Sequence, residues 1–342
     1  MIKVVSFGEF MLRLSPPGHE RFLQSPEFVA TFGGGEANVA VSLAQFGLDS
    51  WYVSKLPRHA IGEAAVRALR AEGVRTDAIV RGGNRIGIYY AESGASQRGS
   101  AVIYDRAHSA ISEMDANEVD WSGVLTGAKW LHLTGITPAL GAKGRASTEA
   151  AITAAQAAGV SVSVDLNFRS KLWTEAQAQA VMRPLVKGVD VVIANEEDLQ
   201  NVLGITVAHT DVASGALDVS GFETAARQVA DEFGVRMVAI SQRESVSASD
   251  NGWSALLWDA ATSTFHQSQH YDIRVVDRIG GGDSFAAGLI YGLVTGRTPD
   301  ASLRFAVAAS ALKHSIPGDF NHVSVDEVDR LVEGGGSGRV QR

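Results

Sequence analysis

Residues 275–288 read VVDRIGGGDSFAAG, and the rest of the chain is best understood from this stretch outward. Apolar residues lead in, three glycines follow, and a helix-like run continues to Leu293. Consecutive glycines before a helix let backbone N–H groups converge at a point where the helix dipole is positive. We therefore expect an anion hole at Gly280, Gly281 and Gly282.

Asp283 follows the glycines directly and falls in the first turn of the predicted helix. A carboxylate there would repel a bound phosphate, so the position is unfavourable unless the residue has a chemical role. General base toward an attacking hydroxyl is such a role. The alternative is a flexible glycine loop in which Asp283 is an ordinary N-cap.

A second glycine cluster opens another predicted helix in residues 32–44, which read FGGGEANVAVSLA. By itself this cluster is equally typical of a close-packed junction between a loop and a helix. The motifs G-x-x-x-x-G-K-[ST] and G-x-G-x-x-G are both absent from the chain. A Walker-type ATPase and a standard dinucleotide-binding oxidoreductase are therefore disfavoured.

Short apolar strands alternate with Ala-rich amphipathic segments along most of the sequence. We expect strands at residues 2–7, 51–54, 130–133, 160–165, 189–194 and 235–240. We expect helices at residues 37–46, 63–72, 147–158, 175–186, 196–203 and 224–233. This order predicts an α/β fold with a doubly wound, mostly parallel sheet and helices on both faces.

Two regions interrupt this alternation, at residues 10–32 and 77–112, where short segments alternate in polarity. They predict antiparallel strands that are too few to fold alone, and hence a small β-sheet lid over the main sheet. Residues 206–221 are polar and predict a surface loop. We expect residues 1–333 to form a single domain and residues 334–342 to form a disordered tail.

The composition excludes several classes of function. The net charge is −8 and no run of five like charges occurs, so neither nucleic acid nor a membrane is an expected partner. Cysteine is absent, which excludes disulfides, thiolate metal sites and cysteine nucleophiles. The chain begins without an apolar run long enough for a signal peptide, and we expect a cytoplasmic protein.

Taken together, the two glycine clusters resemble the paired signatures of the PfkB/ribokinase family of carbohydrate kinases. The first signature of that family is G-G-x-x-x-N-x-A and the second is D-T-x-G-A-G-D, where residues 277–283 read DRIGGGD. The resemblance covers residues 1–330. It implies a ribokinase-like fold and phosphoryl transfer from ATP with Mg²⁺, with a monovalent cation such as K⁺ as a further cofactor.

The resemblance also implies roles for particular residues. The catalytic group would be Asp283 as the base, with an anion hole formed by Gly280, Gly281 and Gly282. Contacts to the sugar would come from Gly34, Gly35 and Asn38.

Two positions depart from the family pattern. The N-x-x-E motif of the family corresponds to residues 195–198, which read NEED, so Asp198 stands where the family has Glu. The resemblance therefore implies that Asp198 or Glu197 reaches the magnesium ion through water. Arg278 replaces the usual Thr of the second signature, which we interpret as a mark of a subfamily.

Two arginines, Arg106 and Arg169, indicate the chemical class of the substrate. Tyr104 and Arg106 lie on one face of a predicted lid strand by its period of two. Arg169 follows a predicted core strand, at the carboxyl end where open α/β sheets bind ligands. Two arginines that face one cleft favour a carboxylate, which guanidinium binds in a bidentate fork. The alternative is that each arginine makes a surface ion pair.

Four segments around these residues, at 87–89, 104–106, 135–138 and 167–169, look like those of the 2-keto-3-deoxygluconate kinases within the family. By that resemblance the sugar-acid site is lined by Tyr89, Tyr104, Arg106, Ile136 and Arg169, and closed by Asp319. The nucleotide side would use Asn167, Asn195, Ser241, Arg243, Gly280 and Gly282.

The expected reaction is the ATP-dependent phosphorylation of the terminal primary hydroxyl of 2-keto-3-deoxygluconate. A fructokinase-like kinase for a neutral sugar and a non-catalytic sugar-binding module are the alternatives. The expected partners are the sugar acid, ATP and further copies of the chain in a homo-oligomer, dimer or higher.

Overall fold

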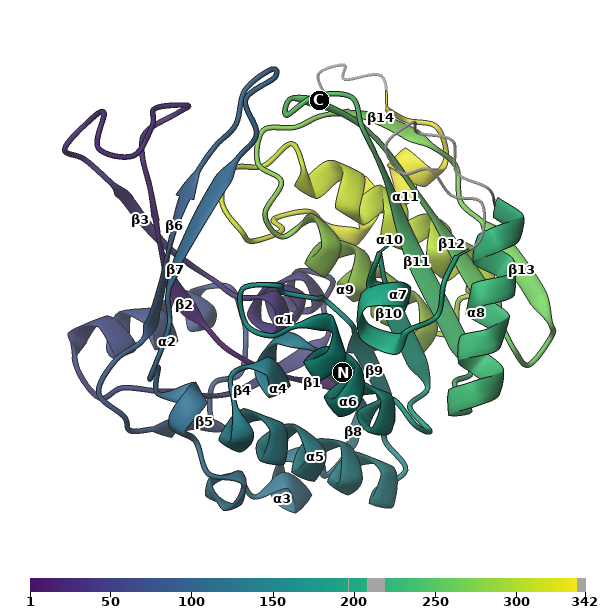
Figure 1. Ribbon diagram of the computed structural model, residues 1–342, viewed down its shortest axis with the longest axis horizontal. Helices are drawn as coiled ribbons and strands as arrows, with labels where there is room; N and C mark the ends of the chain where they lie inside the picture. Colours follow the sequence, from purple (N-terminus) through teal and green to yellow (C-terminus); the bar gives the residue numbers. More distant parts are fainter. Residues whose placement is uncertain (196, 208–218, 337–342) are drawn as a thin grey trace.

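The computed structural model describes residues 1–195, 197–207 and 219–336. Its main feature is a ten-stranded sheet in the order β13-β12-β11-β10-β9-β8-β1-β4-β5, with β14 paired to β12 (Figure 1). The strands of this sheet are β1 (Lys3–Phe7), β4 (Asp49–Leu56), β5 (Ile79–Arg81), β8 (Ala128–Thr134), β9 (Ser161–Asp165), β10 (Val191–Ala194), β11 (Met237–Ser245), β12 (Asp250–Asp259), β13 (Thr264–Gln267) and β14 (Tyr271–Arg274).

From β11 to β5 every neighbouring pair of strands is parallel. Such strands are covered on both faces and therefore consist of apolar, β-branched residues without alternation. The central strand β10 shows this, because all four of its residues are buried. Strands β12, β13 and β14 extend one edge in antiparallel pairing, and the sequence patterns did not predict them.

Helices cover both faces of the sheet. Helices α1, α9, α10 and α11 share one apolar cluster, and α3 and α5 to α8 share another on the opposite face. Thr174 and Ser324 form capping boxes, and Thr298 caps a helix that begins with Pro299. The helices are α1 (Gly35–Gln45), α2 (Ala60–Ala71), α3 (Trp121–Leu125), α4 (Ile136–Ala139), α5 (Ala142–Ala157), α6 (Glu175–Leu185), α7 (Asp198–Leu203), α8 (Val219–Phe233), α9 (Gly281–Val294), α10 (Pro299–Lys313) and α11 (Val325–Val332).

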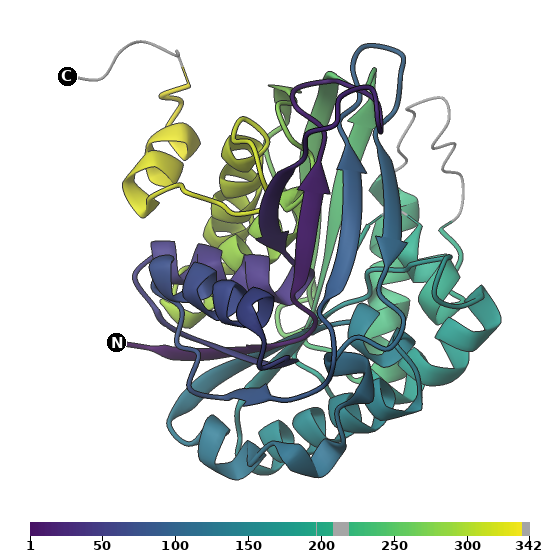
Figure 2. The same ribbon diagram turned by 90° about the vertical axis from the view of Figure 1, so that its left-hand side faces the viewer.

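A second, four-stranded sheet forms the lid, whose strands stand side by side in Figure 2. Its order is β3-β2-β6-β7, with β2 (Met11–Ser15), β3 (Val29–Gly33), β6 (Gly87–Glu92) and β7 (Ala101–Asp105). The prediction of a wholly antiparallel lid was wrong, because β2 and β6 are parallel. Strand β2 follows β1 along the chain, and β6 follows β5. Because β1 and β5 run in the same direction in the main sheet, the chain passes from each of them into the lid in the same direction, and β2 and β6 become parallel.

The predicted ribokinase-like, doubly wound α/β fold with a small lid is confirmed, and all six expected strands and six expected helices are present with shifted ends. Within the region 77–112 that was expected to form lid, β5 instead extends the main sheet beside β4. Most of the loop predicted at 206–221 lies outside the described residues, and α8 already begins at Val219.

The first residues of the predicted tail at 334–342 form the end of helix α11. The N–H groups of Gly334 and Gly335 donate to carbonyl oxygens at the end of α11, and residues 337–342 lie outside the described part. Across the described ranges, no helix has both the length and the apolar character needed to cross a bilayer.

The N-terminus of α9 is held in place by a close approach between α9 and α10. Gly288 and Gly292 lie one turn apart on α9 and face α10. A Cβ atom at Gly288 would stand 2.7 Å from the Cα of Ala306, and one at Gly292 would stand 2.7 Å from the Cα of Ser302. Only glycine allows the two helix backbones to come this close.

Replacing Gly288 by Val should therefore force the two helices apart. We expect the free energy of unfolding to fall by about 1–3 kcal/mol, as measured by urea denaturation. Gly99→Val is the matched control, because open space surrounds Gly99, and its effect should stay within about 0.5 kcal/mol. Equal effects at the two positions would show that the close helix contact is not required.

Candidate active site

A cavity of about 520 Å³ lies between the lid and the carboxyl ends of the parallel strands. The sequence-predicted site residues come from both sides of it, and all except Gly281 line its wall. They are Gly34, Gly35, Asn38, Tyr89, Tyr104, Arg106, Ile136, Asn167, Arg169, Asn195, Glu197, Asp198, Ser241, Arg243, Gly280, Gly282, Asp283 and Asp319.

Hydrogen bonds join the tip of the lid sheet to the main sheet. Ser96, at the tip of the β6–β7 hairpin, accepts the N–H of Ala248 at 2.7 Å. The N–H of Ser96 donates to the hydroxyl of Ser249 at 3.0 Å. The lid hairpin thus reaches the β11–β12 turn and is hydrogen-bonded to it.

The glycines before α9 do not all face the cavity. A Cβ atom at Gly281 would lie 2.3 Å from the ring of His314, and the N–H of Gly281 donates to the carbonyl of Arg278. Gly280 has a φ of +86°, which favours glycine. Helix geometry leaves the N–H groups of Gly282 and Asp283 without intrahelical acceptors. Of the predicted glycines, Gly280 and Gly282 line the cavity, Gly281 does not, and the N–H of Asp283 is a further candidate donor.

Asp283 occupies the third position of α9, at the positive end of the helix dipole. Its carboxylate accepts a hydrogen bond from Nδ2 of Asn38 at 2.7 Å. Burial raises the pKa of Asp283 to about 6, against the opposing effects of the Asn38 hydrogen bond and the charges of Arg169 and Lys313. The carboxylate is thus mostly ionised at neutral pH, yet basic enough to accept a proton.

Asn38 joins the two glycine clusters. Its Oδ1 accepts the N–H of Gly34 at 3.3 Å, while its Nδ2 donates to Asp283 and, at 3.4 Å, to Asp319. A Cβ atom at Gly35 would lie 3.5 Å from Oδ1 of Asp283. The two segments that the sequence singled out therefore meet at one carboxylate, although 245 positions separate Asn38 from Asp283.

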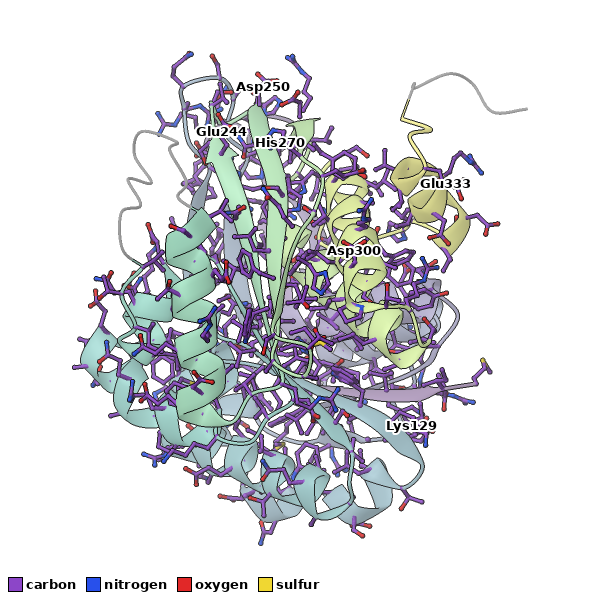
Figure 3. The ribbon with its side chains drawn as sticks, turned by 90° about the vertical axis from the view of Figure 1, so that its right-hand side faces the viewer. Lys129, Glu244, Asp250, His270, Asp300 and Glu333 are labelled. Atoms are coloured by element: carbon purple, nitrogen blue, oxygen red, sulfur yellow. The ribbon has the colours of Figure 1, made fainter. Side chains whose placement is uncertain are left out.

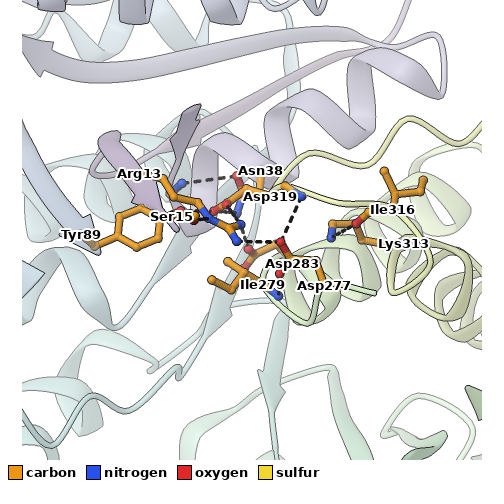
Figure 4. Close-up of polar contacts among 12 residues, drawn as sticks. Arg13, Ser15, Asn38, Tyr89, Asp277, Ile279, Asp283, Lys313, Ile316 and Asp319 are labelled. Carbon is orange, nitrogen blue, oxygen red and sulfur yellow. Dashed lines mark hydrogen bonds and ion pairs between the residues drawn. The ribbon is translucent and has the colours of Figure 1, made fainter. Parts of the chain in front are cut away.

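A buried charge cluster links the lid to the loop before α9 (Figure 4). Arg13 of β2 donates to Asp277 at 2.7 Å and to Asp319 at 2.8 Å. The hydroxyl of Tyr89 in β6 donates to Asp319 at 2.6 Å, and Asp277 also accepts the N–H of Gly318. Lid and glycine loop are therefore tied by charges that are hidden from solvent on both sides.

Arg106 is not the free cation that the sequence predicted. Its guanidinium forms a buried ion pair with Glu9, which also accepts the hydroxyl of Ser109 at 2.6 Å. Its Cζ lies 5.2 Å from the ring centroid of Tyr104, as expected for two residues on one face. The pair is buried, so the surface ion pair considered as the alternative is also wrong. Arg106 still reaches the cavity wall, and its contact with a substrate stays a prediction.

Arg169 lies just beyond the carboxyl end of β9, where the sequence placed it. Its Nη1 donates to the carbonyl of Phe168 at 3.1 Å, and within the described part of the chain it forms no ion pair. Burial raises the pKa values of Asp165, Asp198 and Asp283, and the charge of Arg169 opposes the rise in all three. Arg169 therefore has a guanidinium available for an incoming anion.

The residues expected on the nucleotide side lie just after β9 and β10 and within β11. Ser241 donates to the carbonyl of Ala194 at 3.4 Å, and Cζ of Arg243 lies 5.1 Å from the ring centroid of Trp253. Asn167 has a φ of +42°, a left-handed conformation that asparagine tolerates better than most residues. All of these residues, Ala194 and Trp253 included, line the cavity.

The acidic residues near this end do not form a complete metal site. The carboxylate of Asp198 accepts the N–H groups of Phe168 and Asn195, and Asn195 in turn accepts the N–H of Glu197. In the ranges that the structure describes, no three His, Cys, Asp or Glu side chains are grouped to hold a metal ion. Because Mg²⁺ usually binds one or two carboxylates together with substrate phosphates, the site fits an ion that enters with a nucleotide.

Sequence reasoning missed Glu9 and Arg13 as site residues. Both make their ion pairs with residues far along the chain, so no local motif marks them. One weak signal was present for Arg13, because the period of two in β2 puts it on the same face as the buried Met11. A charged residue on the buried face of a strand requires a partner.

Comparison with known proteins gives consistent results. A family model described as pfkB family carbohydrate kinase matches residues 1–321. A crystal structure of 2-dehydro-3-deoxygluconokinase from Thermotoga maritima is 50% identical, with a TM-score of 0.94 over 98% of this chain and 100% of that one. A 2-dehydro-3-deoxygalactonokinase from Haloferax volcanii is 31% identical over 98% of both chains. A ribokinase-like structure from E. coli with ATP and Mg²⁺ shares the fold, at 17% identity and a TM-score of 0.78.

The buried charge cluster generates a stability prediction. Replacing Arg13 by Met leaves Asp277 and Asp319 buried without their cation, so the free energy of unfolding should fall by about 3–5 kcal/mol. Arg145→Met is the control, because Arg145 pairs with Glu149 at the exposed surface of α5, and its loss should cost about 0.5 kcal/mol or less. Urea denaturation measures the free energy of unfolding of both variants. Equal losses of this free energy would show that the buried charge cluster is not important for stability.

Proposed function

The chain belongs to the pfkB family of carbohydrate kinases, and from that premise we propose that it phosphorylates the terminal primary hydroxyl of 2-keto-3-deoxygluconate with ATP. The observation that carries the proposal is Arg169, an available guanidinium in the same cavity as the Asp283 carboxylate. The relative of that specificity from Thermotoga maritima, matched over nearly the whole of both chains, supports the same substrate class.

The chemistry follows from the arrangement around Asp283. The sugar hydroxyl attacks the γ-phosphorus of ATP, and its proton passes to the Asp283 carboxylate, which Asn38 holds at 2.7 Å. A bond forms between the sugar oxygen and phosphorus, and the bond from phosphorus to the leaving ADP oxygen breaks. The N–H groups of Gly282 and Asp283 stabilise the charge on the phosphoryl oxygens.

Mg²⁺ that enters with ATP would supply positive charge to the phosphate oxygens. Glu197 and Asp198 lie at the cavity wall and would hold it through water, because the Asp198 oxygens already accept backbone N–H groups. The protein itself would orient the phosphate chain through the backbone at the start of α9, through Asn195 after β10, and through Ser241 and Arg243 of β11.

The opposite end of the cavity suits a sugar acid. Arg169 provides a guanidinium for the carboxylate, and Arg106, held by Glu9, lies across the cavity wall. Tyr89 and Tyr104 of the lid cover this end, with ring centroids 6.1 Å apart. Gly34 and Gly35 leave room for a sugar to approach the backbone of α1.

The two alternatives considered from the sequence are not favoured. A neutral sugar would leave Arg169 without an ion-pair partner on the substrate, and the relatives from Thermotoga maritima and Haloferax volcanii described above are named for keto-deoxy sugar acids. A non-catalytic module would not need an ionised carboxylate held beside orphan N–H groups. A cytoplasmic location and a homo-oligomeric state stay predictions. The resemblance also implied a monovalent cation such as K⁺ as a cofactor, and the buried Lys313 described below bears on that expectation.

A panel of sugars tests the proposal directly. A coupled assay of ADP release should give turnover with 2-keto-3-deoxygluconate and its galactonate counterpart, and little with fructose or ribose. Arg169→Ala should lower kcat/KM for the keto acids by about 10- to 100-fold, since charged hydrogen bonds contribute about 1.5–3 kcal/mol.

Residual turnover of fructose should change little in the Arg169→Ala variant. Arg145→Ala, at the exposed pair with Glu149, is the control and should match the wild type on every sugar. If the keto-acid and neutral-sugar activities fall equally, or if the wild type prefers fructose, the sugar-acid assignment is wrong.

A further inference from the structure

Lys313, the last residue of α10, is a lysine with 0% of its side chain exposed. Its Nζ donates to the carbonyl of Ile316 at 3.2 Å (Figure 4). Lysine is almost never fully buried unless its charge is compensated, because an ammonium loses its hydration on burial. The mechanism described above does not use this residue, so its position requires another explanation.

Lys313 lies directly behind the glycine loop. A Cβ atom at Gly280 would stand 3.1 Å from Cε of Lys313, while Gly280 itself lines the cavity and Lys313 does not. Helix α10 is fastened to the same loop, because the hydroxyl of Ser310 donates to the carbonyl of Gly281 at 2.7 Å. A change of charge at Lys313 would therefore be felt at the anion donors of α9.

The charges around Lys313 balance. Asp277 and Asp319 are both bound by Arg13, and in the described ranges Lys313 forms no ion pair within 4.0 Å. Burial lowers the pKa of Lys313, and the charges of Asp277, Asp319 and Asp283 oppose that fall. Asp277 and Asp319 thus face two cations, Arg13 and Lys313, while Asp283 faces Lys313 and Arg169.

Without the Lys313 charge this buried cluster would carry a net negative charge beside the place where phosphate binds. With it the four groups Arg13, Lys313, Asp277 and Asp319 carry no net charge, and the Asp283 carboxylate has the further cation Arg169 nearby. The carboxyl end of α10 adds negative potential that also favours an ammonium at this point. The Lys313 ammonium is thus a cation of the protein itself that lies next to the loop of Gly280 and Gly281.

We propose that the Lys313 ammonium is a built-in cation that supports the anion hole from behind, so that turnover requires no added monovalent cation. Lys313 acts through the loop of Gly280 and Gly281 and is a positioning residue. It holds the donors of α9 and offsets the negative charge of Asp277 and Asp319 as the phosphoryl group enters. The inference rests on the proposed phosphoryl transfer.

The first test uses the wild-type enzyme in tetramethylammonium buffer free of K⁺, Na⁺ and NH₄⁺, with the sugar that the panel identifies. Adding KCl at constant ionic strength should change kcat by less than about twofold, a difference of about 0.4 kcal/mol in the barrier. A rise of tenfold or more in kcat, on the order of 1.4 kcal/mol, would overturn the proposal.

The second test removes the cation. Lys313→Ala should lower kcat by about tenfold or more, change KM for the sugar little, and recover part of its kcat when ammonium or methylamine is added. Lys129→Ala is the matched control, since Lys129 is exposed on β8, far from the cavity (Figure 3). Its kcat should equal that of the wild type and should not respond to ammonium.

A Lys313→Ala variant with the wild-type kcat would overturn the proposal, as would a loss of kcat that no amine restores, because a merely structural lysine gives that result. If the variant does not fold, the wild-type measurement in K⁺-free buffer decides alone. Failure of the proposed function is distinguished at the outset, because the wild type would then turn over no keto acid under any salt condition.

Discussion

In the proposed reaction Asp283 must stay ionised while a phosphoryl group enters beside it, and the surrounding structure offsets the repulsion between these like charges. The carboxylate sits in the first turn of α9, where the helix dipole and orphan N–H groups favour negative charge. Asn38 holds it by one hydrogen bond from α1. The close packing of α9 on α10 at Gly288 fixes the position of these groups. Gly288 lies about one and a half helical turns from Asp283.

Compensating charge comes from several elements rather than from one residue. Arg169 approaches from β9, Lys313 from α10, and Arg13 from the lid. Because Arg13 binds both Asp277 and Asp319, opening the lid would break a buried ion pair beside the glycine loop. These ion pairs tie the lid strand β2 to the loop before α9 and to the loop that carries Asp319.

Sequence patterns predicted the parts of this structure that are local. Two glycine clusters, each opening a helix, located the carboxylate, its asparagine and the cavity, and the alternation of strands and helices predicted the sheet. What they missed depends on partners far along the chain. Glu9 neutralises Arg106, and Arg13 joins Asp277, across separations that no motif spans. The parallel pair in the lid was missed for the same reason, since its direction is set by strands of the other sheet.

The account rests on Asp283 as the base, and kcat of the Asp283→Asn variant tests it most directly. Asparagine keeps the shape of the side chain and removes the negative charge that accepts the proton. At saturating keto acid and ATP, kcat should fall by about 10²- to 10⁴-fold. The dissociation constant of the sugar should stay close to that of the wild type. A variant that retains kcat within tenfold of the wild type would contradict the account.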